Sequence, residues 1–499
     1  MKNEEIEMRR NGMLLPIASL PSPYGIGGFS KEAYEFIDLL EETGQKLWQI
    51  LPLGPTSYGD SPYQSFSTFA GNPYFIDLDT LAEKGWLTKE ACEASDYGDN
   101  ESYIDYGRIY NSRFVLLKQA FLNSDILSDE KFTEFCKANQ HWLPDYALYM
   151  ALKNQNDGKS WIEWEEEIRL RKPEAVEYYK KELEEECNFY EFLQYEFHEQ
   201  WTKVKEYAHE KGIQIVGDVP IYVAFDSADT WANPELFQLD EKNLPLGVAG
   251  CPPDAFSATG QLWGNPLYNW AYHKKTGYDW WLKRIAYCFD LYDIVRIDHF
   301  RGFDEYYSIP YGDETAVNGH WEKGPGMDLF NTVKEKLGEL DIIAEDLGFL
   351  TESVFQLLKD SGYPGMKVLQ FAFDPSEDSD YLTYKYQRNC VVYTGTHDND
   401  TTAGWFEKLS DGDKEVALRY MNSFYTPKEE QHWDLIALAM RSTADTCIIP
   451  VQDFLGLGSE ARINMPSTLG DNWKWRMTKG AFSEELKEKI RRMTKLYGR

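Results

Sequence analysis

Short, almost wholly apolar segments recur along the chain, and several end at, or directly before, a proline, a glycine or an acidic residue. Each has the length of a β-strand, and such uninterrupted apolar runs are typical of parallel strands covered by helices on both faces. The eight segments span residues 12–20, 47–55, 213–223, 293–300, 341–348, 367–373, 390–399 and 447–458. Amphipathic helical patterns lie between many of them, for example at 30–44 and 351–362.

Eight such strands with helical connections predict an α/β fold, namely a (β/α)8 TIM barrel with large, mainly helical insertions between strands. The 499 residues leave ample room for those insertions. We expect a single catalytic unit over residues 1–499, with a mainly helical inserted subdomain at 80–210 between the second and third strands. A second inserted segment is expected at 224–290, and its Gly/Pro-rich part, 246–266, is expected to be an active-site loop.

Charge and aromatic content narrow the range of ligands. The chain has 83 acidic and 51 basic residues, a net charge of −32. That charge repels phosphate backbones and anionic lipids, which disfavours nucleic acid and membrane partners. The 16 Trp and 33 Tyr residues offer flat faces with polar edges, which suit amphipathic ligands such as sugars as well as a large core.

Cysteine usage and the first residues indicate a compartment. The seven cysteines are scattered without a C-x-x-C pair, and the eight histidines show no paired spacing. This pattern favours reduced thiols and no metal centre. The first ten residues, MKNEEIEMRR, are charged and polar, so we expect a cytoplasmic location. We expect no metal or organic cofactor.

Carboxylates gather at the predicted strand ends, where barrel enzymes build their active sites. Some of these residues, Asp346 and Asp453 above all, are equally compatible with capping the helices that follow. The set comprises Asp218, Asp298, Glu345, Asp346, His397, Asp398, Asp400 and Asp453.

The stretch DIVRIDHFRG (293–302) places charge inside an apolar strand. Because strand side chains alternate, Arg296 and Asp298 should face the barrel mouth together, either as a structural ion pair or as a functional one. We expect Arg296 to lower the pKa of Asp298 and keep it ionised, as a nucleophile requires. Glu345 ends another apolar strand and has less fixed positive charge nearby to stabilise its ionised form. Its pKa should therefore rise, as a general acid requires. Such a pair is typical of a retaining glycosidase-type site.

These motifs resemble one enzyme family. VRIDHFRGF, IAEDLG and TGTHDNDT are similar to the catalytic strand motifs of amylomaltases, the 4-α-glucanotransferases or disproportionating enzymes of the α-amylase clan. The resemblance extends from about residue 12 to about residue 477. It implies transfer of α-1,4-glucan segments between maltooligosaccharides, or starch- or glycogen-derived chains, by a retaining double displacement.

The resemblance also implies residue roles. Asp298 would be the nucleophile, Glu345 the general acid/base and Asp398 the transition-state stabiliser. Substrate-binding roles would fall to Arg296, His397, Asp218, Tyr63, Asp254, Trp263 and Asn464, with Tyr58 and Tyr106 as a more remote sugar platform. The chain departs from the family pattern at Ser467, where many relatives have glycine.

Four other interpretations compete with this one. An α-1,4-glucan hydrolase of the same clan is the main alternative; Asp218 lacks the Asn-His pair that α-amylases place after the corresponding aspartate, which favours a transferase. A catalytically inactive glucan-binding protein is disfavoured by the intact carboxylate set. GLGSEA (456–461) matches a dinucleotide-binding pattern but lacks the acidic residue at the expected distance. An aldolase would need a strand-end lysine, and none of the eight segments ends in one.

Overall fold

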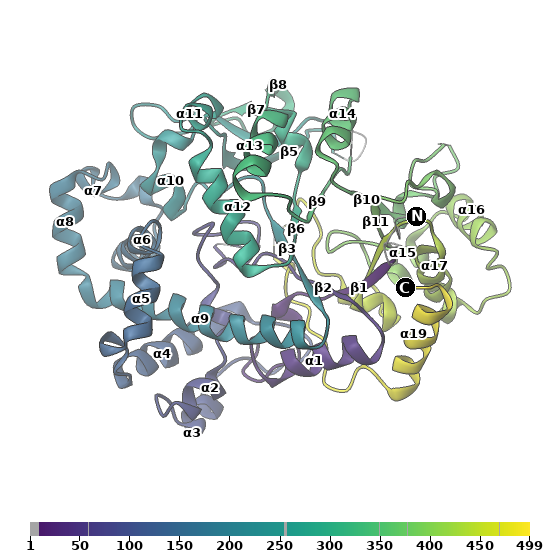
Figure 1. The fold of residues 1–499 in the computed structure, drawn as a ribbon, viewed down its shortest axis with the longest axis horizontal. Coiled ribbons are helices and arrows are strands. Elements are labelled where there is room, and N and C mark those ends of the chain that lie inside the picture. The colour runs from purple at the N-terminus through teal and green to yellow at the C-terminus, as the bar shows by residue number, and fades with distance from the viewer. Residues whose placement is uncertain (1–8, 58, 254–256, 349, 377, 469) are drawn as a thin grey trace, which may run out of the picture.

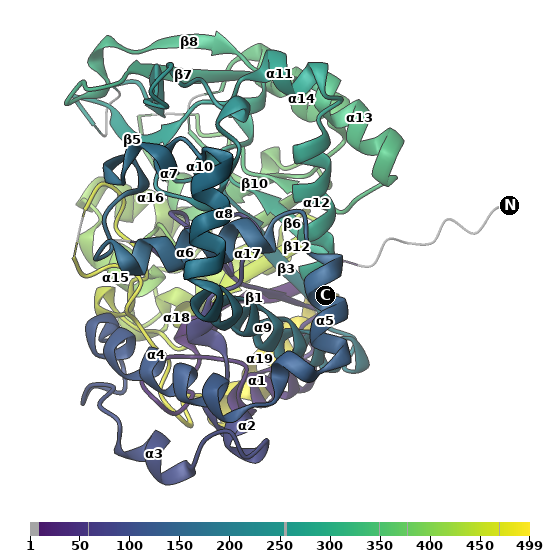
Figure 2. The ribbon, with the colours of Figure 1, turned by 90° about the vertical axis from the view of Figure 1, so that its left-hand side faces the viewer.

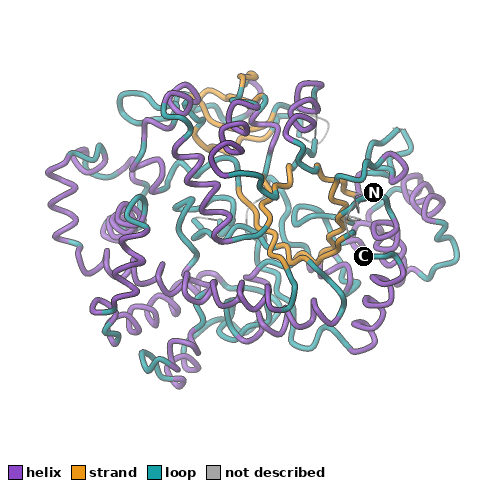
Figure 3. The backbone as a smooth tube through the Cα atoms, viewed as in Figure 1, coloured by secondary structure: helices purple, strands orange, loops and turns teal. Residues whose placement is uncertain are grey.

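A closed ring of eight parallel strands forms the centre of the molecule. The computed structural model describes residues 9–57, 59–253, 257–348, 350–376, 378–468 and 470–499. The ring is seen close to end-on in the middle of Figures 1 and 3. Its strands are β1 (Arg10–Leu14), β2 (Leu47–Gln49), β3 (Gln214–Val219), β6 (Ile294–Ile297), β9 (Ile342–Ala344), β10 (Gly365–Val368), β11 (Cys390–Tyr393) and β12 (Thr446–Pro450). The predicted (β/α)8 barrel is confirmed, with strands shorter than the apolar runs that predicted them.

The strand order is β10-β11-β12-β1-β2-β3-β6-β9, with every pairing parallel. The ring closes between β9 and β10, the two ends of this order. There the amide of Ala344 donates to the carbonyl of Pro364 at 2.9 Å. Asp346 accepts from the amide of Met366 at 2.6 Å on the same side. Asp346 therefore holds β9 against β10, and it does not cap a helix.

Helices cover the outside of the ring. In α1 the buried Phe36, Ile37 and Leu40 face the barrel, as the amphipathic pattern at 30–44 predicts. The helices that follow β1 and the later barrel strands are α1 (Lys31–Glu42), α13 (Met327–Leu337), α14 (Glu352–Ser361), α15 (Thr402–Lys408), α16 (Asp411–Met421), α17 (Gln431–Arg441), α18 (Val451–Phe454) and α19 (Glu484–Leu496).

The long connection between β2 and β3 is helical and lies on one side of the barrel, in blue on the left of Figure 1 and at the front of Figure 2. Its last helix, α9, returns the chain to β3, and its Trp201 indole donates to the carbonyl of Leu291 at 3.0 Å. The helices are α2 (Leu78–Glu83), α3 (Lys89–Ala94), α4 (Tyr106–Asn123), α5 (Glu130–Ala138), α6 (Leu143–Gln155), α7 (Glu166–Arg169), α8 (Pro173–Glu182) and α9 (Glu184–Glu210).

A second, antiparallel sheet lies above the barrel in the views of Figures 1 and 2, with strand order β5-β4-β7-β8. Its strands are β4 (Gly247–Cys251), β5 (Gln261–Pro266), β7 (Glu305–Pro310) and β8 (His320–Lys323). The prediction that 246–266 is a loop was therefore wrong over β4 and β5. Glycine here permits close pairing, since a Cβ on Gly250 would lie 2.1 Å from the carbonyl oxygen of Gln261. Helices α10 (Ala228–Ala232), α11 (Trp270–Lys275) and α12 (Asp279–Leu291) complete the connection from β3 to β6.

Short 3-10 helices occur in the loops throughout. They are Ile17–Ser19, Pro73–Phe75, Ile126–Ser128, Trp161–Glu163, Pro234–Leu236, Phe300–Phe303, Ala316–Asn318, Leu369–Phe371, Thr383–Lys385, Lys428–Glu430 and Ser459–Ala461. The GLGSEA stretch ends in the last of these, so its glycines do not lead from a strand into a nucleotide-binding helix.

Ser467 adopts a left-handed backbone conformation with φ of 63°. This explains why glycine suits the position, since side chains with a Cβ are strained there. We expect Ser467→Gly to raise the free energy of unfolding by about 0.5–1 kcal/mol, measured by urea denaturation. Ser160→Gly is the matched control, because Ser160 has φ of −59° and makes no side-chain cap bond, so glycine there should lower stability. Equal effects of the two substitutions would contradict this explanation.

Candidate active site

Asp298 and Glu345 are brought together by the register of neighbouring strands. Ile297 of β6 pairs with Ala344 of β9, so the next residues, Asp298 and Glu345, leave the barrel side by side. The Glu345 amide donates to the carbonyl of Ile297 at 3.0 Å, which fixes this alignment. Both side chains thus lie at the C-terminal mouth of the barrel, as predicted.

Arg296 links two carboxylates at this mouth. It lies in register with Asp218 of β3, and one of its terminal nitrogens (Nη1) donates to both carboxylate oxygens of Asp218 at 2.8 and 2.7 Å. Its other terminal nitrogen (Nη2) lies 3.0 Å from Oδ1 of Asp298. Tyr63 completes the cluster, because its hydroxyl donates to Oδ2 of Asp218 at 3.0 Å. The prediction that Arg296 and Asp298 face the barrel mouth together is confirmed.

Replacing Arg296 should destabilise the fold, because its side chain is 4% exposed and that of Asp218 is not exposed at all. We expect Arg296→Met to lower the free energy of unfolding by about 3–5 kcal/mol, since it leaves Asp218 buried without a counter-charge. Urea denaturation measures the loss. The double variant Arg296→Met/Asp218→Asn should recover part of it because no unpaired charge remains. A stable Arg296→Met protein would mean that Arg296 is not the counter-charge of Asp218.

The two central carboxyl groups differ in their surroundings. Burial raises the pKa of Glu345, and the negative charge of Asp298 raises it further. Burial also raises the pKa of Asp298, although Arg296 opposes the shift. Arg296 lowers the pKa of Asp298 as expected, but burial has the larger effect, so the net shift is upward and not downward. Arg296 also donates two hydrogen bonds to Asp218. Because Arg296 contacts Asp298 directly, a proton shared by the pair resides preferentially on Glu345.

Backbone amides hold Glu345 in place. Oε2 accepts from the amide of His299 at 2.7 Å, and Oε1 accepts from the amide of Leu347 at 2.8 Å. His299 itself has a left-handed backbone, with φ of 50° and ψ of 48°. The carboxyl group is therefore fixed in one orientation before any ligand arrives, which is how a general acid is preorganised.

The loop after β11 supplies the third carboxylate. Asp398 lies 3.3 Å from Nε2 of His397 and accepts from the side-chain amide of Asn464 at 2.6 Å. Arg462 donates to the Asp398 carbonyl at 2.5 Å, which fixes the backbone. The Tyr63 ring stacks on His397 with centroids 5.1 Å apart, so the Asp398 cluster adjoins the Asp218 cluster. Around Arg296 the structure thus joins six further predicted residues at one mouth, namely Asp218, Asp298, Tyr63, His397, Asp398 and Asn464.

Trp263 lies on the Glu345 side of the mouth. Its ring meets that of His299 edge-on at 4.8 Å. Sequence reasoning missed His299, although a titratable residue between Asp298 and Phe300 was a visible signal. Burial and the nearby Arg301 lower the pKa of His299 to about 3, so the imidazole is neutral.

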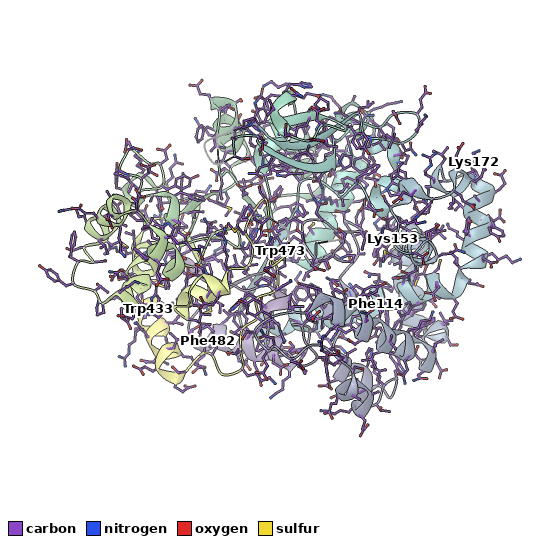
Figure 4. All side chains as sticks on the ribbon, turned by 180° about the vertical axis from the view of Figure 1, so that it is seen from behind. Phe114, Lys153, Lys172, Trp433, Trp473 and Phe482 are labelled. Carbon is purple, nitrogen blue, oxygen red and sulfur yellow. The ribbon has the colours of Figure 1, made fainter. Side chains whose placement is uncertain are left out.

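Trp473 was also missed. Its ring lies 5.8 Å from Tyr63 and 5.9 Å from His397, and Figure 4 shows it near the centre of the molecule. The available signal was an aromatic residue in the polar stretch DNWKWR (471–476) outside any apolar run. Tyr106, predicted as a remote platform, donates its hydroxyl to the carbonyl of Trp473 at 2.9 Å.

Some predictions fall outside this geometry. Asp254 and Tyr58 lie outside the described residues.

Among the residues described, no group of three or more His, Cys, Asp and Glu side chains is arranged to hold a metal ion. In the same part of the chain, no helix combines the length and apolar character that crossing a membrane requires. Asp453, buried at the end of the barrel, accepts from Thr394 and Thr402 and ties the β11 loop to β12.

Comparison with known proteins places this site in context. A family model described as 4-alpha-glucanotransferase matches residues 15–482. A 4-alpha-glucanotransferase of Clostridium butyricum is 54% identical over 97% of this chain and 99% of its own length. One from Thermus thermophilus is 46% identical over 97% of this chain and 98% of its own length. The solved amylomaltase of Streptococcus agalactiae in complex with acarbose is 43% identical, with a TM-score of 0.95, over 98% of this chain and 99% of that one.

Proposed function

The chain belongs to the 4-alpha-glucanotransferase family and is an amylomaltase-type enzyme, and we propose that it works by double displacement at Asp298, Glu345 and Asp398. The donor is an α-1,4-linked maltooligosaccharide or longer glucan. The acceptor is the 4-hydroxyl of a second glucan or of glucose. Net retention of the anomeric configuration follows from two inversions at one carbon.

In the first step Glu345 donates its proton to the leaving glycosidic oxygen while Asp298 attacks the anomeric carbon. The glycosidic bond breaks, a bond to the Asp298 carboxylate forms, and Glu345 is left ionised. The raised pKa of Glu345 supports the acid role, and the contact of Arg296 with Asp298 supports the nucleophile role.

In the second step Glu345 takes the proton of the acceptor 4-hydroxyl, and the acceptor oxygen displaces Asp298. Asp398, oriented by His397 and Asn464, is placed to bind hydroxyl groups of the reacting sugar and to stabilise its positive charge. Tyr63 and Trp263 offer ring faces to neighbouring sugars.

One observation carries this proposal: the β6–β9 register puts Asp298 beside Glu345, with the cation of Arg296 on Asp298 and backbone amides on Glu345. The two carboxyl groups are therefore unequal, as acid and nucleophile must be. The matched relatives are named glucanotransferases, which favours transfer over the hydrolase alternative. A net charge of −32 fits an uncharged glucan.

Maltotriose alone separates transfer from hydrolysis. We expect glucose together with a ladder of longer maltooligosaccharides, at constant total reducing ends, followed by chromatography and a reducing-sugar assay. Because the amylomaltase with TM-score 0.95 was solved with acarbose, acarbose should inhibit formation of the ladder. Reducing ends that rise without longer products would identify a hydrolase.

A further inference from the structure

The aromatic ring of Trp473 lies beside the group formed by Asp398, His397 and Asn464. None of the predicted roles includes Trp473. Its ring contacts Tyr63 and His397, at centroid separations of 5.8 and 5.9 Å. Trp473 is only partly buried, so the residue is accessible from solvent beside these groups. A flat apolar face with a polar edge, next to hydroxyl-binding groups, suits a pyranose ring.

The backbone of Trp473 is held in a conformation that tryptophan does not favour. Its φ is 65°, in the left-handed region, which costs residues with a Cβ about 1–2 kcal/mol. Two hydrogen bonds hold the residue there. Its amide donates to the carbonyl of Ile463 at 2.7 Å, and its carbonyl accepts from the Tyr106 hydroxyl at 2.9 Å. Strain at such a position persists only where the surroundings fix it.

Part of those surroundings comes from the helical connection between β2 and β3. Residues 102–106 lie against residues 473–476, and we call this pairing the 102–106/473–476 clamp. The Ile104 amide donates to the Lys474 carbonyl at 2.8 Å, and the Arg476 amide donates to the Ser102 carbonyl at 2.8 Å. Tyr106, the first residue of α4, closes the clamp at Trp473.

We propose that Trp473 is a glucan-contacting residue of the active site and that Tyr106 is the residue that positions it. This inference rests on the proposed function. The Tyr106 hydroxyl is engaged by the Trp473 carbonyl, so it acts on the glucan through the ring of Trp473. The helical connection thereby sets the shape of the site from outside the barrel.

A double-mutant cycle on maltotriose disproportionation tests the proposal. Tyr106→Phe keeps the ring and removes only the hydroxyl, so kcat/KM should fall about 2- to 10-fold, as expected for one hydrogen bond. Trp473→Ala should lower it about 10-fold, and Trp473→Phe should restore part of the loss. In the Trp473→Ala background, Tyr106→Phe should have no further effect.

Control variants separate a loss of the Trp473–glucan contact from a structural defect. Tyr110→Phe removes a hydroxyl one turn along α4, where the residue is 54% exposed, and should leave kcat/KM unchanged. Thermal melting checks folding; should Trp473→Ala not fold, Trp473→Gly replaces it, since glycine suits a φ of 65°.

Three results would overturn the inference. The first is wild-type kcat/KM without the Trp473 ring. The others are no loss from Tyr106→Phe in the wild-type background, or an equal loss from Tyr106→Phe with and without that ring. Failure of the proposed function is distinct, because the wild-type protein would then form no ladder.

Discussion

Asp298→Asn should abolish glucan transfer, lowering kcat on maltotriose on the order of 10⁴-fold or more, as removal of a catalytic nucleophile does in other enzymes. An amide cannot form the glycosyl ester on which the second step depends. Product chromatography after long incubation measures the residual rate. Asp293→Asn is the matched control, since Asp293 lies just before the same strand, at the other end of β6, and accepts from the Ile215 amide. That variant should keep its activity.

The inactive variant should still fold, and its stability should depend on pH differently from that of the wild type. Because the pKa of Asp298 is raised in the folded protein, its ionisation destabilises the fold as pH rises through that pKa. The uncharged amide that Asp298→Asn introduces avoids this loss, so the variant should melt higher than wild type at about pH 8, with the difference shrinking toward about pH 4. Transfer at the wild-type rate by Asp298→Asn would contradict the nucleophile assignment.

The barrel was predictable because each of its strands lies in a mostly apolar run, a pattern that leaves few alternatives. The small sheet was not. Gly250 and the neighbouring prolines of 246–266 are typical of a loop, yet Gly250 allows β4 and β5 to approach closely. Composition alone cannot separate glycine that permits a turn from glycine that permits close strand pairing.

The site was predictable in its residues and less so in its electrostatics. Asp298, Glu345 and Asp398 follow apolar strands and so reach the mouth of any barrel built from them. The division of Arg296 between Asp218 and Asp298 depends on the β3–β6 register, which no local pattern reveals. Trp473 reaches the site through contacts with residue 106, distant in sequence, so its place depends on the tertiary fold.

Glu345→Gln should lower kcat on maltotriose about 10²- to 10⁴-fold, because the leaving oxygen loses its proton donor. A donor such as α-maltosyl fluoride needs no such proton, so its first step should survive in the variant. The second step lacks its base, so a burst of fluoride should leave a maltosyl group on Asp298, visible as a mass increase in the peptide that contains it. Azide, an acceptor that needs no base, should restore turnover.

The pH profile distinguishes loss of this proton from a general defect in binding. In the wild type, kcat/KM on maltotriose should fall as pH rises through the raised pKa of Glu345, because only the protonated form can act as the acid. This alkaline limb should therefore lie above the usual carboxyl value of about 4.3. It should be absent when Glu345→Gln reacts with the fluoride donor. A variant that releases no fluoride, or one whose alkaline limb persists, would show that Glu345 is not the general acid and that another group protonates the leaving sugar.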